Sequence, residues 1–212
     1  MAKKKNNNGF SLFKLLVLVF SALVVVTFFL PVFSANEDYA LYDENSKVSS
    51  ANLVFVSEEK AEEKQEELLK SYTNGDIEKE EYEKGAAKYL AIAGFKDEDF
   101  EERDSVVAVA WLHFVAAVLA LCSFVVVILS LLGIKLDKFA KFALCGSVVL
   151  LIVALIVALS FLGKDTVLSG LTKNTYGDLY VLSFGGVVLG LVASALGAVS
   201  AFLASPCKKA KK

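Results

Sequence analysis

The sequence contains few of the residues that build catalytic and metal sites. Its 212 residues include one histidine, three cysteines, two prolines and one tryptophan. No Ser/His/Asp or Cys/His catalytic arrangement is evident around the single histidine, and no His/Cys/carboxylate group has metal-site spacing. No glycine-rich phosphate loop follows a strand. We therefore expect a non-enzymatic protein with no cofactor, no metal, no nucleic-acid partner and no identifiable small-molecule substrate.

Cysteine is absent from the longest polar segment, residues 34–104, so no disulfide frames that segment. Cys122 and Cys145 lie inside apolar runs instead. Cys207 follows the last run beside a lysine cluster, where acylation is one interpretation. We favour the other, a reduced thiol without a role.

Formal charge is missing from four long apolar runs, apart from Lys14 near the start of the first and Lys141 near the start of the third. The runs are residues 10–33, 105–133, 139–162 and 179–204. A helix needs about 20 apolar residues to cross the hydrocarbon core of a bilayer. The sequence therefore predicts an all-α membrane protein: a four-transmembrane-helix bundle in the lipid bilayer, with an acidic helical insert at residues 34–104.

Net charge is sorted between the polar segments. Lysines dominate residues 1–9, 134–138 and 205–212. Asp137 is the only acid among them, whereas residues 34–104 are acidic. Because lysine-rich loops stay in the cytoplasm, we expect both termini to be cytoplasmic, and residues 34–104 and 163–178 to be extracytoplasmic. The lysine and asparagine content points to the plasma membrane of a bacterium.

The first apolar run has two interpretations. A basic start, an apolar run and the small residues Ser34 and Ala35 also describe a secretory signal. The run is longer than a usual signal core, so we favour an uncleaved anchor. Pro31 stands near its outer end, where a proline ends a helix at little cost.

Residues 57–93 predict a helical hairpin. Ser57 can cap the first helix, and Gly75 can stop it in the left-handed conformation. Asp76 can cap the second helix, and Gly94 is expected to end it. The charged residues of both helices are expected to face solvent.

The string from Glu67 to Leu90 resembles the short helical module known as SHOCT. The matching residues are Leu68, Gly75, Ile77, Glu80, Glu81, Tyr82, Lys88 and Leu90. Ser71 and Ala86 depart from the pattern, which has an apolar residue and a lysine there. The resemblance implies oligomerisation or partner contact rather than catalysis.

Two shorter stretches of the insert are open to two interpretations each. Residues 53–56 are β-branched and aromatic, which favours a short strand or a packed extended segment. Residues 97–104 hold six carboxylates that can attract a divalent cation, although they lack the ligand pattern of a calcium loop. We favour a solvated lead-in to the helix that follows.

The second apolar run carries the only histidine, His113, about nine residues from its outer end. The only charged residues in the four runs are Lys14 and Lys141, each near the start of its run, so a proton carrier is the less favoured interpretation of His113. We prefer a neutral imidazole bonded to a backbone carbonyl or to Ser160 at similar depth. Trp111, Tyr176 and Tyr180 are expected to anchor the membrane interface.

The last apolar run carries small residues at helical spacing. Gly186, Gly190, Ser194 and Ala198 recur every four residues, beside a second row of Ala193, Gly197 and Ala201. Small residues at this spacing let two helices approach closely. The rows either pack within the bundle, which we favour, or pair with another copy or a partner.

The predicted membrane topology is similar to that of claudin-like tetraspans. The tryptophan and paired cysteines of the first claudin loop are missing from residues 36–104. We carry no function from this topology. Our leading hypothesis is a structural, assembly or regulatory membrane protein that contacts a membrane-protein partner or another copy. Contact would use the external helical segment and the fourth transmembrane helix. The alternatives are a small channel or transporter component, or a subunit that senses cations.

Overall fold

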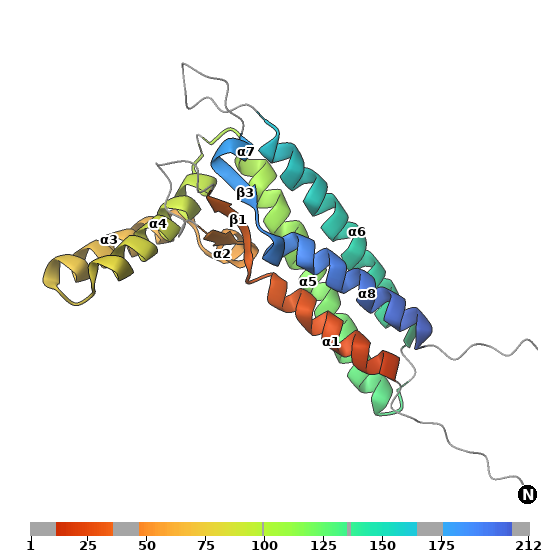
Figure 1. Cartoon of the computed structure of the whole chain (residues 1–212). Coiled ribbons are helices and arrows are strands. Elements are labelled where there is room, and N and C mark those ends of the chain that lie inside the picture. The colour runs from red at the N-terminus through yellow and green to blue at the C-terminus, as the bar shows by residue number, and fades with distance from the viewer. Residues whose placement is uncertain (1–11, 36–46, 99, 135–136, 165–175, 205–212) are drawn as a thin grey trace, which may run out of the picture.

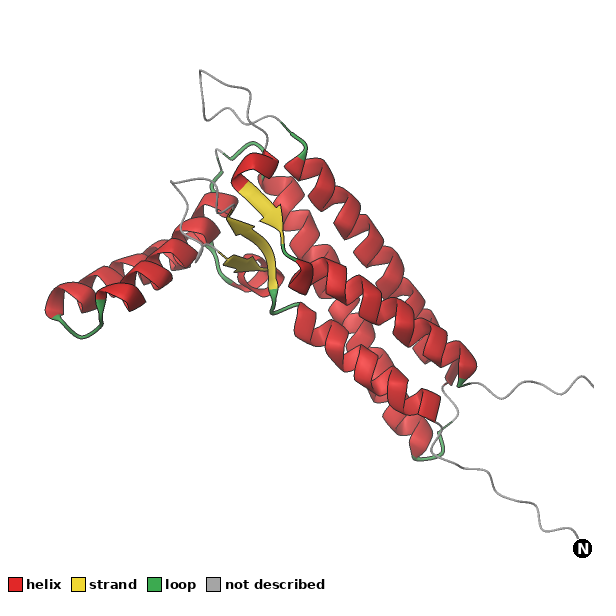
Figure 2. Cartoon of the chain, in the orientation of Figure 1, coloured by secondary structure: helices red, strands yellow, loops and turns green. Residues whose placement is uncertain are grey.

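The computed structural model describes residues 12–35, 47–98, 100–134, 137–164 and 176–204, and is mostly helical (Figure 1). The helices are α1 (Leu12–Thr27), α2 (Ser50–Phe55), α3 (Glu58–Asn74), α4 (Lys79–Lys96), α5 (Arg103–Leu131), α6 (Asp137–Leu162), α7 (Tyr176–Leu179) and α8 (Leu189–Leu203). A π-helical turn, η1 (Phe184–Val188), leads into α8. The strands are β1 (Pro31–Ala35), β2 (Lys47–Ser49) and β3 (Tyr180–Leu182), which stand at one end of the helices (Figure 2).

Helices α1, α5, α6 and α8 lie side by side (Figure 1). Three helical segments in the described part of the chain are long and apolar enough to cross a membrane: Arg103–Leu131, Lys138–Leu162 and Phe184–Leu203. Helix α1 is apolar but has only 16 described residues, or about 24 Å. Three of the four expected membrane helices are therefore long enough to cross a membrane. The described part of α1, the first of the four, is shorter.

Many small and hydroxyl-bearing residues lie in the interior of the bundle, together with a few larger ones such as Leu144 and Leu151, whereas many large apolar side chains face outward. Ala110, Ala116 and Ala120 of α5 are buried, and Ser147 of α6 donates a hydrogen bond to the carbonyl of Ala116 at 2.8 Å. The first large exposed apolar side chain on α5 is that of Trp111. From there to Leu131, the last residue of α5, the helix spans about 30 Å, which matches the hydrocarbon thickness of a bilayer.

A three-stranded antiparallel sheet of order β2-β1-β3 replaces helix at two places, so the all-α expectation is wrong there. Residues 31–33 and 180–182 were assigned to the first and fourth transmembrane helices. Pro31 has no N–H to continue a helix, and α1 ends at Thr27. The freed backbone groups need partners, and Phe33 finds them opposite Val48 in β2 and Leu182 in β3.

Helix α2 corrects a second expectation, because residues 53–55 are helical rather than extended. Ser49 caps α2 by accepting a hydrogen bond from the backbone N–H of Asn52 at 3.2 Å. The N–H of Ala51 donates to the carbonyl of Phe28 at 3.1 Å. Leu53 is buried. Capping and burial together decide the helix over the strand that composition favoured.

Helices α3 and α4 form an antiparallel hairpin, called the arm here, that extends away from the bundle (Figure 1). Ser57 and Gly75 cap α3 as predicted, with Gly75 at φ 81°. The expectations for α4 were wrong at both ends. Glu78 rather than Asp76 is its N-cap, and the helix continues past Gly94 to Lys96. Only the base of the arm joins the protein core, through Ala61, Ala91, Ile92 and Phe95.

Candidate functional site

A buried chain of hydrogen bonds joins three elements around His113. His113 is fully buried in α5, and its Nδ1 lies 2.9 Å from the hydroxyl of Ser50 in α2. Its Nε2 lies 3.3 Å from the hydroxyl of Thr27, the last residue of α1. Both hydroxyls are also fully buried. The site thus holds the short first helix, the short α2 and the long α5 together.

The donors in this chain follow from the proton count of each group. The Thr27 hydroxyl has one proton, which it donates to the carbonyl of Val24 at 2.7 Å. Its oxygen therefore accepts from Nε2–H of His113. In the neutral ring, Nδ1 then carries no proton and accepts from Ser50. A neutral imidazole in this arrangement has both nitrogens satisfied.

Ser160, the side-chain partner that we considered for His113, is exposed on α6 and does not join this site. The hydroxyls that do join, Thr27 and Ser50, were not found by sequence reasoning. The sequence gives little sign that these two hydroxyls meet His113. The first apolar helix is expected to continue beyond Thr27, and Ser50 lies in a stretch without a predicted element. The neutral state that we preferred for the imidazole stays a prediction, and the side-chain partners of the ring differ from the expected one.

The small residues of the last helix are used inside the fold. A Cβ atom on Gly190 would lie 2.8 Å from Thr27 Oγ1, and one on Gly197 would lie 3.2 Å from Phe20 Cβ. Gly186 lies under β1, where a Cβ atom would be 2.7 Å from the Pro31 carbonyl oxygen. The remaining members are buried as well: Ala193, Ser194, Ala198 and Ala201. They let α8 approach α1 closely, as the favoured interpretation predicted.

Of the three expected interface anchors, only Trp111 is largely exposed, at 49%. It packs against Phe114, and Phe114 contacts Phe55 of α2, which is 58% exposed. Tyr176 is buried and stacks on Phe161 at a centroid distance of 4.9 Å. Tyr180 is partly buried against Phe95 at 4.8 Å. Tyr176 and Tyr180 therefore belong to the aromatic core around the sheet.

The acidic lead-in to α5 is solvated only in part. Glu102 is buried, and both of its carboxylate oxygens accept hydrogen bonds from Lys164 Nζ, at 2.6 and 2.7 Å. Ser105 adds a third hydrogen bond at 3.0 Å. This pair ties the start of α5 to the end of α6.

Burial and the neighbouring charges of Glu102 and Glu101 raise the pKa of the Tyr176 phenol nearby. Within the described ranges, no three His, Cys, Asp or Glu residues lie close enough to hold a metal ion.

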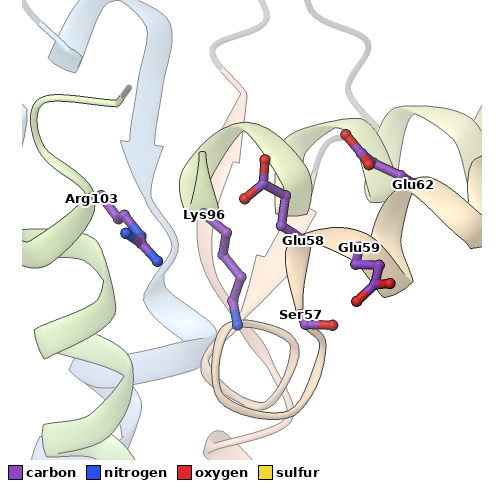
Figure 3. A pocket seen from close by; sticks show the side chains of 6 residues that line it. All are labelled: Ser57, Glu58, Glu59, Glu62, Lys96 and Arg103. Carbon is purple, nitrogen blue, oxygen red and sulfur yellow. The ribbon is translucent and has the colours of Figure 1, made fainter. Parts of the chain in front are cut away.

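An open pocket of about 390 Å³ lies at the base of the arm (Figure 3). Its lining residues are Ser57, Glu58, Glu59, Glu62, Lys96 and Arg103. Burial and the charge of Arg103 lower the pKa of the Lys96 amine. Among the described residues, neither Lys96 nor Arg103 makes a side-chain hydrogen bond or ion pair, so the two cations line the pocket without pairing with the carboxylates of α3.

The far part of the arm exposes an apolar patch on a charged surface. Leu69 and Tyr72 lie one helical turn apart on α3 and are 51% and 38% exposed. Tyr82 of α4 stacks on Tyr72 at a centroid distance of 4.9 Å. We call Leu69, Tyr72 and Tyr82 the tip patch. The remaining exposed side chains of the arm are mostly charged, apart from Leu90 of α4 at 66% exposure, and several form exposed ion pairs along each helix.

The long apolar helices with outward-facing large side chains indicate an integral membrane protein. No family model, no curated protein and no solved structure matches the chain. The resemblances to the SHOCT module and to the claudin-like topology therefore stay predictions.

Proposed function

We propose that the protein is a non-enzymatic integral membrane protein that acts through protein–protein contacts of the arm. In this proposal α1, α5, α6 and α8 form a four-helix transmembrane bundle. The arm and the sheet lie on the extracytoplasmic side of a bacterial plasma membrane, and both termini lie in the cytoplasm. The role is structural, assembly or regulatory.

The distribution of net charge supports this orientation. Lys14 in the first turn of α1, and Lys138 and Lys141 in the first turns of α6, lie at the end of the bundle opposite the arm (Figure 1). The arm and the start of α5 carry most of the carboxylates. Positive residues are retained on the cytoplasmic side of a membrane.

The observation that carries the contact role is the tip patch. Leu69 and Tyr72 are held on a stiff hairpin, away from the core that buries other large apolar residues. The hairpin is stiff because α3 is capped at both ends and because Leu68 packs against Gly85 of α4. Exposed aromatic and aliphatic groups on a charged surface are typical of protein contact sites. The small residues of α8 are used internally, so the proposal places contact on the arm and not on that helix.

Site-specific photo-crosslinking in intact membranes tests the proposal. A benzophenone amino acid at position 69 should give one or a few discrete crosslinked products, and Tyr72→Ala should remove them. The same probe at position 63, which is exposed elsewhere on α3, is the matched control. Equal diffuse crosslinking from both positions, or none from position 69, would count against a contact role.

A further inference from the structure

The pocket at the base of the arm is built from opposite charges that do not pair with each other. Lys96 comes from the end of α4 and Arg103 from the start of α5, whereas Glu58, Glu59 and Glu62 come from the first turns of α3 (Figure 3). Elsewhere on the arm, opposite charges at helical spacing do form ion pairs, such as Lys84 with Glu80 at 2.6 Å. Two cationic groups and three carboxylates of the pocket are therefore available to a bound ligand.

The position of the pocket relative to the lipid-facing surface limits the kind of ligand that can bind there. Phe55, exposed and packed on Phe114, precedes Ser57 by two positions. Trp111 marks the start of the exposed apolar surface on α5, about two helical turns after Arg103. Aromatic side chains of this kind sit at the boundary between hydrocarbon and headgroups. The pocket thus opens at the level of the lipid headgroups, beside the acyl-chain surface formed by Phe55.

We infer that this pocket binds a zwitterionic phosphoethanolamine group, supplied by the headgroup of a membrane lipid. The phosphate lies between Lys96 and Arg103, because a guanidinium and an ammonium together suit its oxygens. The primary ammonium donates to the carboxylates of Glu58, Glu59 and Glu62. The acyl chains run past Phe55 toward the bundle. An anionic headgroup without an ammonium leaves the three carboxylates unpaired, so the pocket discriminates against it.

Native mass spectrometry of the full-length protein released from nanodiscs tests this inference. The nanodiscs contain phosphatidylethanolamine mixed with equal phosphatidylglycerol or phosphatidylcholine. The wild-type protein should retain phosphatidylethanolamine in preference to both. Lys96→Met/Arg103→Met should lower its retention about tenfold, the size expected for lost charge-assisted hydrogen bonds. Glu58→Gln/Glu59→Gln/Glu62→Gln should abolish the preference over phosphatidylglycerol.

Lys70→Met and Glu66→Gln are the matched controls, because these residues form an ion pair that is 75% exposed on each side and lies away from the pocket. Both should leave lipid retention unchanged. Circular dichroism melting shows which variants fold. If the double methionine variant unfolds, the lipid preference of the triple glutamine variant still decides the question. Wild-type protein without a lipid preference, or pocket variants that match the controls, would overturn the inference.

A second arm of the experiment identifies the source of the group. Soluble glycerophosphoethanolamine is titrated into detergent-purified protein by calorimetry, with the double methionine variant as the reference. Binding of the lipid alone supports the membrane source. Binding of the soluble compound that the variant loses, without lipid retention, supports the same site chemistry but overturns the lipid source.

Discussion

Ser50 Oγ lies 2.9 Å from Nδ1 of His113, and this contact joins α2 to the interior of the bundle. The two residues are far apart in the chain, and both are fully buried. On the other side of the ring, Thr27 accepts from Nε2–H. Because α1 ends at Thr27 and α2 begins at Ser50, both hydroxyls reach His113 and form a polar junction that is closed to solvent.

The first prediction concerns this junction. Thr27→Val and Ser50→Ala each leave one imidazole nitrogen without a partner, so each should lower the free energy of unfolding by about 1–2 kcal/mol. Thermal unfolding in detergent measures the loss, and nitrogen-15 spectra of the labelled histidine should report the Nε2–H tautomer. Ser160→Ala, on an exposed site, is the control. Equal stability of all three variants would show that the junction contributes nothing.

Two glycine-to-alanine changes should have opposite effects. Gly190→Ala places a methyl group 2.8 Å from Thr27 Oγ1, which should destabilise the protein by about 1–3 kcal/mol through overpacking. Gly94→Ala lies within α4 with nothing within 4 Å of the new methyl group. It should stabilise the protein by about 0.5–1 kcal/mol, because alanine loses less backbone entropy in a helix. The same unfolding assay compares them, and a stabilising Gly190→Ala would contradict the close approach of α8 to α1.

The Glu102–Lys164 pair gives a third prediction. The Glu102 side chain is 8% exposed and that of Lys164 48% exposed. Lys164→Met leaves a buried carboxylate without its cation, so it should cost about 2–3 kcal/mol, near the lower end for buried pairs. Glu102→Gln/Lys164→Met removes both charges and should recover most of this loss.

An exposed pair supplies the comparison for that third prediction. Lys70→Met breaks the contact with Glu66 and should change stability by less than about 0.5 kcal/mol. A double variant no more stable than Lys164→Met would mean that lost packing, rather than the stranded carboxylate, explains the cost.

Tyr176 predicts a dependence of stability on pH. Burial raises the pKa of its phenol above the ordinary value of 10.0. The unfolded chain therefore loses this proton first, and the stability supplied by the neutral phenol falls as pH rises above about 10. The lowered pKa of Lys96 acts in the opposite direction in this range, so the wild type is compared with Tyr176→Phe. The phenylalanine variant should lose less stability between about pH 9 and 11, and identical slopes would argue that the phenol is not shifted.

The fifth prediction concerns orientation. Position 80 is exposed on the arm, and Glu80→Cys in a background without the native cysteines should react with an impermeant maleimide on whole cells. Lys138→Cys, at the opposite end of the bundle, should react only after the cells are opened. The reverse pattern would place the arm in the cytoplasm.

Sequence reasoning found the parts of the fold that depend on neighbours along the chain. The long helices α5 and α6 follow from apolar length, and the caps of α3 follow from Ser57 and Gly75. The sheet could not be found this way, because strands of three to five residues have no period of their own. Apolar residues such as Val32 and Val181 have the same composition in a strand as at the end of a transmembrane helix.

The polar contacts of the structure were missed for a related reason. Thr27, Ser50 and His113 come from three separate parts of the chain, and only packing brings them together. In the sequence Glu102 is one member of an acidic run that is expected to be solvated. In the structure Lys164 binds its carboxylate. The one available signal was Lys164 itself, a lone cation directly after an apolar run.

Apolar run length and charge placement, which act locally, were enough to predict membrane helices and a charged helical hairpin. Which small residues meet, where α1 ends, and which polar groups are sealed against water depend on distances between segments far apart in the chain. Buried hydrogen-bonding groups must find partners wherever the folded backbone provides them. That requirement is met only in three dimensions, and here it produces the sheet, helix α2 and the His113 junction.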